Sequence, residues 1–220
     1  MAIEARYDGI LGAARDVIAR RGFHQASIRE IASASGLSLA GLYHYVGGKD
    51  ELLFLVLDRS LDRLLAALET AWESARSPET RLQALVETHL DFASRDPHAL
   101  KIINRDYDVL GEPHRSEIAA KRQVYLQRGL AVLSALDRHR RSEEELLAAT
   151  ILLLGMLNGL ATRPFIRSGR NVRALATEVA NLFLNGFLGR GAEDRRHDPE
   201  PVDLAAGTDG AGRAGDARRV

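Results

Sequence analysis

The chain has 220 residues, of which 45% are hydrophobic and 27% charged. Its 30 Lys and Arg residues balance 30 Asp and Glu residues, so the formal net charge at pH 7 is zero. No chain-wide attraction to nucleic acid follows from this balance, and any DNA-binding surface must be local. The sequence has no cysteine, which excludes disulfides, thiolate zinc sites and cysteine nucleophiles.

The N-terminal residues are charged early and include no apolar h-region, so we expect no secretory signal and a cytoplasmic protein. The most apolar run covers residues 146–161 and includes Thr150 and Asn158. It is shorter than the roughly 20 apolar residues that a membrane-spanning helix needs. We therefore expect a buried helix there and no membrane contact.

Apolar residues recur at helical spacing along the chain, and no strand pattern is evident, which predicts an all-α fold. The first helix is expected over residues 4–21, with Gly22 as its C-terminal stop. A short second helix begins at Ser27, which has capping-box spacing to Glu30, and ends at Gly36.

A third short helix is expected over residues 38–45, and Lys49 begins a long fourth helix that reaches about residue 75. Prolines mark the starts of three later helices, and a second capping box marks the start of the apolar helix. A proline ends that helix, and an N-cap residue begins the last one. These signals are Ser77-Pro78, Asp96-Pro97, Glu112-Pro113, Ser142 with Glu145, Pro164 and Asn171, the last beginning a helix to about Leu188. The chain should therefore contain about nine helices.

Residues 190–220 are rich in Gly, Ala, Arg and Asp and poor in large aliphatic side chains. Such a segment cannot bury enough apolar surface to offset its ordering entropy. We expect a disordered tail.

The second and third helices are separated only by Gly36 and Leu37, which is the spacing of a helix-turn-helix. In that motif the second of the two helices enters the major groove of DNA. The alternative is an ordinary helical hairpin within a bundle.

Residues 10–53 resemble the TetR family of bacterial regulators. The resemblance rests on Ser27–Ala32, Gly36–Ser38, Gly41–Tyr45 and Gly48–Leu53, with the Gly22-Phe23 pair at the end of the first helix. It implies a three-helix DNA-binding head over residues 1–48 and a helical ligand-binding and dimerisation domain over residues 49–189. The implied function is a repressor that a small molecule releases from a palindromic operator.

The resemblance implies that one set of residues meets DNA: Ser27, Arg29, Ser38, Leu39, Ala40, Gly41, Tyr43, His44 and Lys49. Within this set Ser27 and Lys49 would hold phosphates, and Tyr43 and His44 would lie at the groove. Leu42 and Tyr45 would pack inside the head.

Leu39 and Gly41 depart from the family pattern, because neither offers a hydrogen-bonding side chain to a base. Sequence readout should then depend on Tyr43, His44, apolar contact and DNA shape. Residues 1–50 carry six basic and five acidic side chains, so the salt dependence of DNA binding should be shallow.

Residues 146–160 are apolar on nearly all sides, so this helix should be buried all round, one face on its own domain and the other on a partner. The resemblance implies a homodimer built from this helix and the last one. The candidate interface residues are Leu147, Ile151, Leu154, Gly155, Asn158, Gly159, Val179, Phe183 and Phe187. The alternative is that both helices fill the core of a monomer.

A small-molecule pocket is implied between the head and the dimer helices. Its candidate residues are Trp72, Phe92, Ile103, Tyr107, Tyr125 and Arg128, and the alternative assigns the aromatic residues to the core and Arg128 to the surface. Residues 155–170 resemble regulators of fatty-acid and steroid breakdown, some of which bind acyl-CoA thioesters. Arg105, Arg122 or Arg163 could meet an acidic ligand.

The seven histidines include no paired metal motif such as H-E-x-x-H, and no nucleophile elbow, phosphate loop or dinucleotide fingerprint occurs. We expect no enzyme, no cofactor and no metal. Two alternatives remain open: an all-helical enzyme, and a ligand-binding or interaction module of the same fold that has lost sequence-specific DNA binding.

Overall fold

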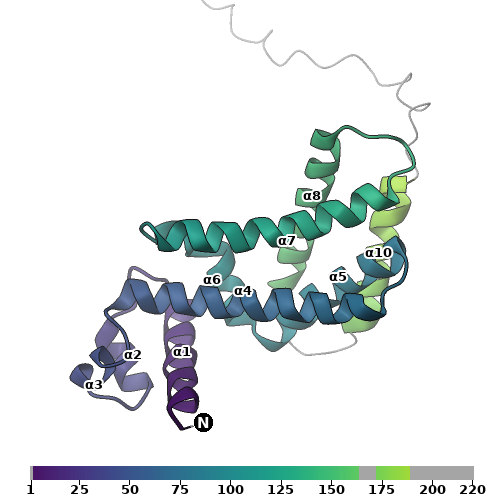
Figure 1. The fold of residues 1–220 in the computed structure, drawn as a ribbon. Coiled ribbons are helices and arrows are strands. Elements are labelled where there is room, and N and C mark those ends of the chain that lie inside the picture. The colour runs from purple at the N-terminus through teal and green to yellow at the C-terminus, as the bar shows by residue number, and fades with distance from the viewer. Residues whose placement is uncertain (1, 164–171, 189–220) are drawn as a thin grey trace, which may run out of the picture. The chain divides into compact units, whose positions relative to one another are not determined.

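The computed structural model describes residues 2–163 and 172–188, and every regular element within these ranges is a helix (Figure 1). The α-helices are α1 (Ala2–Arg21), α2 (Ile28–Ala34), α3 (Leu39–Tyr43), α4 (Lys49–Ser74), α5 (Pro78–Arg95), α6 (Pro97–Arg105), α7 (His114–Leu136), α8 (Glu143–Ala161) and α10 (Val172–Leu188), with a 3-10 turn η1 (Tyr107–Val109). The prediction of an all-α chain with about nine helices is confirmed for these residues. The expected tail over residues 190–220, Pro164 and Asn171 lie outside the described residues.

Most of the described helix starts follow the predicted signals, but Pro113 is the N-cap of α7 instead of its first residue. Ser142 and Glu145 form a full capping box before α8, and Asp96 caps α6 by accepting a hydrogen bond from Ala99 N at 3.0 Å. Ser27 and Glu30 form only half of the predicted box. Ser27 Oγ accepts from Glu30 N at 3.1 Å, but the Glu30 carboxylate accepts from Arg21 Nε at 2.8 Å.

The buried side chains form two clusters. The first joins α1, α2, α3, the start of α4 and α6, and includes Ile18, Leu42, Leu57 and Ile102. The second joins the end of α4 with α5, α7, α8 and α10. Because α6 contributes Ile102 to the same cluster as the head helices, apolar packing continues across the predicted boundary at residue 48.

Helix α8 divides into two faces. Leu146, Thr150, Leu153 and Leu157 are buried in their own chain, as expected, whereas the opposite face is open in the single chain, with Leu152 70% exposed. Among the described residues, α8 is the one helix whose length and composition would allow it to cross a membrane, a test that the core helix of a soluble domain also passes.

Candidate nucleic-acid interface and ligand pocket

The turn between α2 and α3 is built on Gly36. Its φ of +68° lies in the left-handed region that favours glycine, and Leu37 N donates to Ala32 O at 2.9 Å to close the end of α2. Ser38 then begins α3, its Oγ accepting from Gly41 N at 3.0 Å. The two short helices are therefore joined by the compact turn that the spacing predicted.

Helix α3 is anchored by one face and open on the other. Leu42 is fully buried, as predicted, while Tyr43 is 50% exposed and His44 is also exposed. The prediction that Tyr45 packs inside the head is wrong, because Tyr45 is 37% exposed. Val46, whose N–H donates to Leu42 O at 3.3 Å just after α3, is 3% exposed and takes the buried position instead.

A side chain at Gly41 would fit closely against the start of the helix. A Cβ on Gly41 would lie 3.2 Å from Ser38 Oγ, the atom that caps the helix, and 3.6 Å from Leu37 Cδ2. Ala40 is exposed and Leu39 is half-buried. The readout residues of this helix are thus few, and Tyr43 and His44 offer the polar side-chain groups at its C-terminal end.

The arginine and the lysine of the predicted DNA-contacting set differ in their surroundings. Arg29 is exposed and makes no ion pair with any described residue. The ammonium of Lys49 donates to Phe23 O at 2.9 Å and to Ala26 O at 3.1 Å, and lies 4.3 Å from the centre of the Phe23 ring. Lys49 therefore holds the loop between α1 and α2 against the start of α4, a role that sequence reasoning missed.

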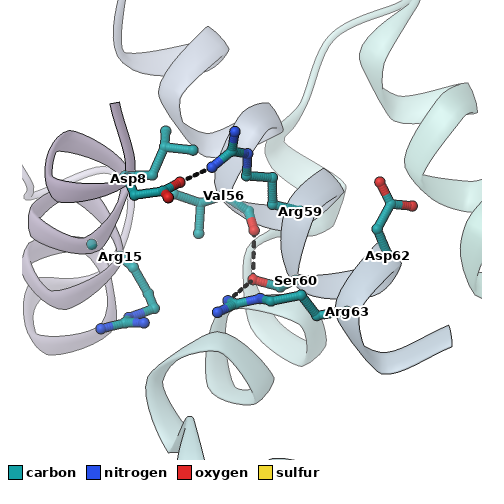
Figure 2. A pocket seen from close by; sticks show the side chains of 9 residues that line it. Asp8, Arg15, Val56, Arg59, Ser60, Asp62 and Arg63 are labelled. Carbon is teal, nitrogen blue, oxygen red and sulfur yellow. Dashed lines mark hydrogen bonds and ion pairs between the residues drawn. The ribbon is translucent and has the colours of Figure 1, made fainter. Parts of the chain in front are cut away.

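A groove of about 480 Å³ lies between α1 and α4, and Figure 2 shows the charged side chains that line it. Arg59 pairs with Asp8 across the groove. Arg15 Nη1 and Arg63 Nη2 lie 2.9 and 3.1 Å from Asp96 Oδ2 at the start of α6. These cations therefore already have carboxylate partners. Their ion pairs connect α1 of the head to α4 and to the start of α6.

Helix α6 makes the other polar contacts with α1. His98 Nδ1 lies 3.0 Å from Asp16 Oδ1, and Arg105 Nη2 donates to Ile18 O at 2.8 Å. Burial alone would raise the pKa of Asp16, but hydrogen bonds from His98 and Arg15 lower it below its usual value. Because α6 also carries residues of the pocket described next, it connects that pocket to the head.

The second cavity, also of about 480 Å³, lies among α4, α5, α6, α7 and α8. Its lining is mainly apolar, with a polar side chain on several of the helices. The residues are Leu61, Leu64, His89, Leu100, Ile103, Asn104, Tyr107, Ala119, Arg122, Gln123, Tyr125, Leu126, Ile151, Leu154, Gly155 and Asn158.

Three of the six predicted pocket residues, Ile103, Tyr107 and Tyr125, line this cavity. The other three do not. Trp72 donates its indole N–H to Arg81 O at 3.1 Å, and Arg128 pairs with Glu69 at 2.7 Å and lies over the Trp72 ring. Phe92 packs between the two apolar clusters. These three residues instead fit the alternative, in which the aromatic side chains belong to the core and Arg128 to the surface.

Sequence reasoning missed His89 and Asn104 and assigned Asn158 to the dimer interface. Asn104 Nδ2 donates to Asn158 Oδ1 at 2.8 Å and so connects α6 to α8 beside the cavity. The signal that could have found Asn158 is its polarity within the apolar run 146–161. Arg122 donates to Ile103 O at 2.6 Å and stacks over the Tyr107 ring at 4.1 Å.

His89 is buried, with 3% of its surface exposed, and its Nδ1 lies 3.0 Å from the Tyr125 hydroxyl oxygen. Burial lowers the pKa of His89 to about 4, against the opposing effect of the Asn158 side chain. Burial also raises the pKa of the Tyr125 phenol. Both groups are therefore neutral near pH 7.

The predicted dimer residues divide between the open face and the interior of the chain. Ile151, Gly155 and Gly159 are exposed on α8, and Leu147 and Leu154 are half-buried. Val179 is only 5% exposed, which contradicts its placement on an open face, whereas Phe183 is half-buried and packs partly against its own core. The side chain of Phe187 lies outside the described residues.

Three large apolar side chains that are not in the candidate interface set, Leu152, Met156 and Leu182, are also exposed on these helices. Leu152 and Leu182 are 70% and 72% exposed, on α8 and α10 respectively. Together with Ile151 and Met156 they make up what we call the α8/α10 face.

Comparisons with known proteins cover most of the chain. The family model described as "Bacterial regulatory proteins, tetR family" matches residues 10–56, and that described as "Tetracyclin repressor-like, C-terminal domain" matches residues 75–187. The transcriptional activator FasR of Mycolicibacterium smegmatis is 33% identical over 121 residues, covering 55% of this chain and 53% of that protein. The repressor KstR2 of Mycobacterium tuberculosis is 30% identical over 104 residues, covering 47% and 52%. The chain thus spans about half the length of these curated relatives.

Solved structures of similar fold include a TetR-family transcriptional regulator from Bordetella parapertussis 12822, with 27% identity, a TM-score of 0.77, and 83% of this chain and 96% of that one covered. AibR, in complex with isovaleryl coenzyme A and operator DNA, has 24% identity and a TM-score of 0.69, with 82% and 97% covered. The curated relatives described above are named as regulators, not as enzymes.

Proposed function

This chain belongs to the TetR family of bacterial regulatory proteins, and from that premise we propose that it is a cytoplasmic repressor that a small molecule releases from its operator. The observation that carries the proposal is the helix-turn-helix itself. Helix α3 is anchored in the core by Leu42 and presents Tyr43 and His44 to solvent after a turn built on Gly36.

The proposed DNA surface comprises the nine residues that the family resemblance implies. Tyr43 and His44 would read base edges, while Arg29 and the exposed serines Ser27 and Ser38 would meet phosphates, which position the protein without specifying sequence. Lys49 has N–H groups committed to Phe23 O and Ala26 O. Its contribution to phosphate binding would therefore be smaller than the resemblance implies.

We propose that the α8/α10 face pairs with the same face of a second copy. Large apolar side chains exposed on α8 and α10 are typical of a protein–protein contact. Twofold pairing would also place two α3 helices at half-sites about 34 Å apart, or a multiple of that, as a palindromic operator requires.

The proposed effector is a hydrophobic or acidic metabolite such as an acyl-CoA, bound in the cavity among α4 to α8. Leu100, Ile103 and Asn104 of α6 line this cavity, while Asp96 and His98 of the same helix contact α1. Suppose that α6 can adopt two placements, each of which holds the helix-turn-helix head differently. A ligand that binds one placement of α6 more tightly would make that placement more populated and would thereby change the affinity for the operator.

Gel-shift titration of the protein with its own upstream DNA tests the regulator function. The variants Tyr43→Ala and His44→Ala should each weaken specific binding roughly tenfold, since a lost base contact costs about 1–3 kcal/mol. Val124→Ala is the control, because Val124 is similarly exposed but lies on α7. The slope of log affinity against log salt should be shallow.

The alternative function is a ligand-binding or interaction module that no longer reads DNA. It is favoured by the half-buried Leu39 and by Gly41, which place no hydrogen-bonding side chain at two recognition positions. Binding that is equally weak for upstream and unrelated DNA would support this alternative and contradict the regulator.

A further inference from the structure

Arg122 is the only charged side chain among the described residues that line the cavity among α4 to α8. The other described lining residues are apolar or polar without charge, and none of them is a carboxylate. The pKa of His89, which burial lowers to about 4, leaves its imidazole neutral near pH 7. The cavity wall therefore carries a single positive charge, and no negative charge on it opposes an anionic ligand.

The guanidinium of Arg122 is held in place but keeps donors free. Its Nη1 donates to Ile103 O at 2.6 Å, and its Cζ lies 4.1 Å from the centre of the Tyr107 ring. An arginine has five N–H donors, and those of Nε and Nη2 form a planar fork. Among the described residues, neither of these two nitrogens of Arg122 makes a hydrogen bond or an ion pair.

Other cations on α7 do have carboxylate partners. Lys121 Nζ lies 2.5 Å from Oδ1 of both Asp58 and Asp62, and Arg128 Nη2 lies 2.7 Å from Glu69 Oε1. Arg122 is half-buried, so the solvent screens its charge less than it screens that of an exposed arginine. A charge that is partly withdrawn from water without a counter-ion is unfavourable, and an anionic ligand would supply the counter-ion.

The rest of the lining suits an apolar chain. It includes aliphatic side chains from four helices: Leu61, Leu64, Leu100, Leu126, Ile151 and Leu154. The volume of about 480 Å³ lies within the range of small-molecule sites. A ligand that matches this lining is amphipathic, with an apolar body and one negatively charged end.

We propose that the Nε–Nη2 edge of Arg122 binds the oxyanion head group of an amphipathic ligand, a carboxylate or a phosphate monoester, whose apolar chain lies in the cavity among α4 to α8. This inference rests on the proposed function, because it takes that cavity as the effector site. Two parallel N–H···O bonds from a guanidinium to an oxyanion are stronger than bonds between neutral groups. An alcohol of the same chain length lacks the charge that this edge requires.

Isothermal titration calorimetry of the full chain with octanoate, octyl phosphate and octan-1-ol tests the subsite. The three probes share an eight-carbon chain and differ in the head group. At pH 7.5 and low salt, at least one of the two anions should bind the wild type roughly tenfold more tightly than octan-1-ol, the worth of a charge-assisted hydrogen bond. The tighter anion identifies the head group as a carboxylate or a phosphate.

Variants on α7 test the residue itself. Arg122→Gln removes the charge and should weaken binding of the preferred anion roughly tenfold, to the level of octan-1-ol. Arg122→Lys keeps the charge without the planar fork and should keep part of the preference. Arg128→Gln is the matched control, because Arg128 lies on the same helix, pairs with Glu69 and does not line the cavity. It should bind all three probes as the wild type does.

Octan-1-ol binding as tightly as both anions, failure of all three probes to bind, or an anion preference retained in Arg122→Gln would overturn the subsite. The comparison of probes on the wild type needs no variant, so it stands even if Arg122→Gln fails to fold. The gel shift measures the proposed function without any probe. Operator binding without an anion preference would refute the subsite alone, whereas an anion preference without operator binding would refute the regulator and leave the subsite standing.

Discussion

Gly129 on α7 and Thr150 on α8 lie so close together that a Cβ on Gly129 would stand 2.9 Å from Thr150 Cγ2. Both residues are buried, and the Thr150 hydroxyl is held by Leu146 O at 2.8 Å. A shift of α7 or α8 would therefore be needed to admit a side chain. The small residue sets how closely these two helices pack.

Gly129→Ala should destabilise the fold by about 1–3 kcal/mol through overpacking, in spite of the roughly 1 kcal/mol that alanine gains over glycine in a helix. Gly12→Ala is the matched control, since Gly12 is also helical but nothing lies within 4 Å of its added Cβ. Urea unfolding should show the control unchanged or stabilised. Equal stability of the two variants would refute the close-packing argument.

Asp96 is the residue through which α6 holds the head. Its Oδ1 caps α6 and its Oδ2 meets Arg15 of α1 and Arg63 of α4. Asp96→Ala should lower the free energy of unfolding by roughly 1–3 kcal/mol, from the lost cap and the partly buried ion pairs. Asp96→Asn keeps a capping oxygen and should lose less.

The control for Asp96 is Asp91→Ala, which removes an exposed pair with Arg95 on α5. Exposed pairs contribute little, so its unfolding free energy should stay within about 1 kcal/mol of the wild type. A loss in Asp91→Ala as large as that in Asp96→Ala would show that Asp96 has no special role.

His89 should make stability fall in mild acid. In the unfolded chain His89 takes up a proton near the ordinary histidine pKa of 6.5, whereas burial lowers the pKa in the folded protein to about 4. Between pH 4 and pH 6.5 the unfolded state thus binds more protons than the folded state. The contribution of neutral His89 to the free energy of unfolding is therefore fully present above pH 6.5 and is lost as the pH falls toward 4. The loss amounts to roughly 3 kcal/mol.

Urea unfolding between about pH 7 and about pH 4.5 measures this loss, with His89→Gln as the comparison because glutamine does not titrate. The variant should lose less stability than the wild type over the same interval. Parallel pH profiles of the two proteins would show that His89 is protonated as readily in the folded state as in the unfolded one.

The α8/α10 face should control association. Leu182→Glu or Leu152→Glu would place a charge on a large exposed apolar side chain, and we expect a monomer at micromolar concentration with weaker operator binding. Val124→Glu, on the exposed surface of α7, should leave the dimer intact. Light scattering after size-exclusion chromatography checks all three. A wild-type monomer, or variants that remain dimeric, would contradict the proposed interface.

Much of this architecture could be predicted from the sequence because its determinants are local. Helix starts such as Ser142 depend on a side chain three residues from its partner. The helix-turn-helix depends on Gly36 and the short spacing around it. The family resemblance likewise implied that Leu42 packs inside the head, and Leu42 is fully buried.

Only the tertiary structure decided which side chains meet across helices. His89, Asn104 and Asn158 come from α5, α6 and α8 and form one polar wall, and Lys49 turns to the carbonyls of Phe23 and Ala26. Helical periodicity indicates the face on which a residue lies, but the packing of whole helices determines what that face meets. For the same reason the sequence could predict an apolar final helix, while the fold alone buried Val179 and left Leu182 exposed.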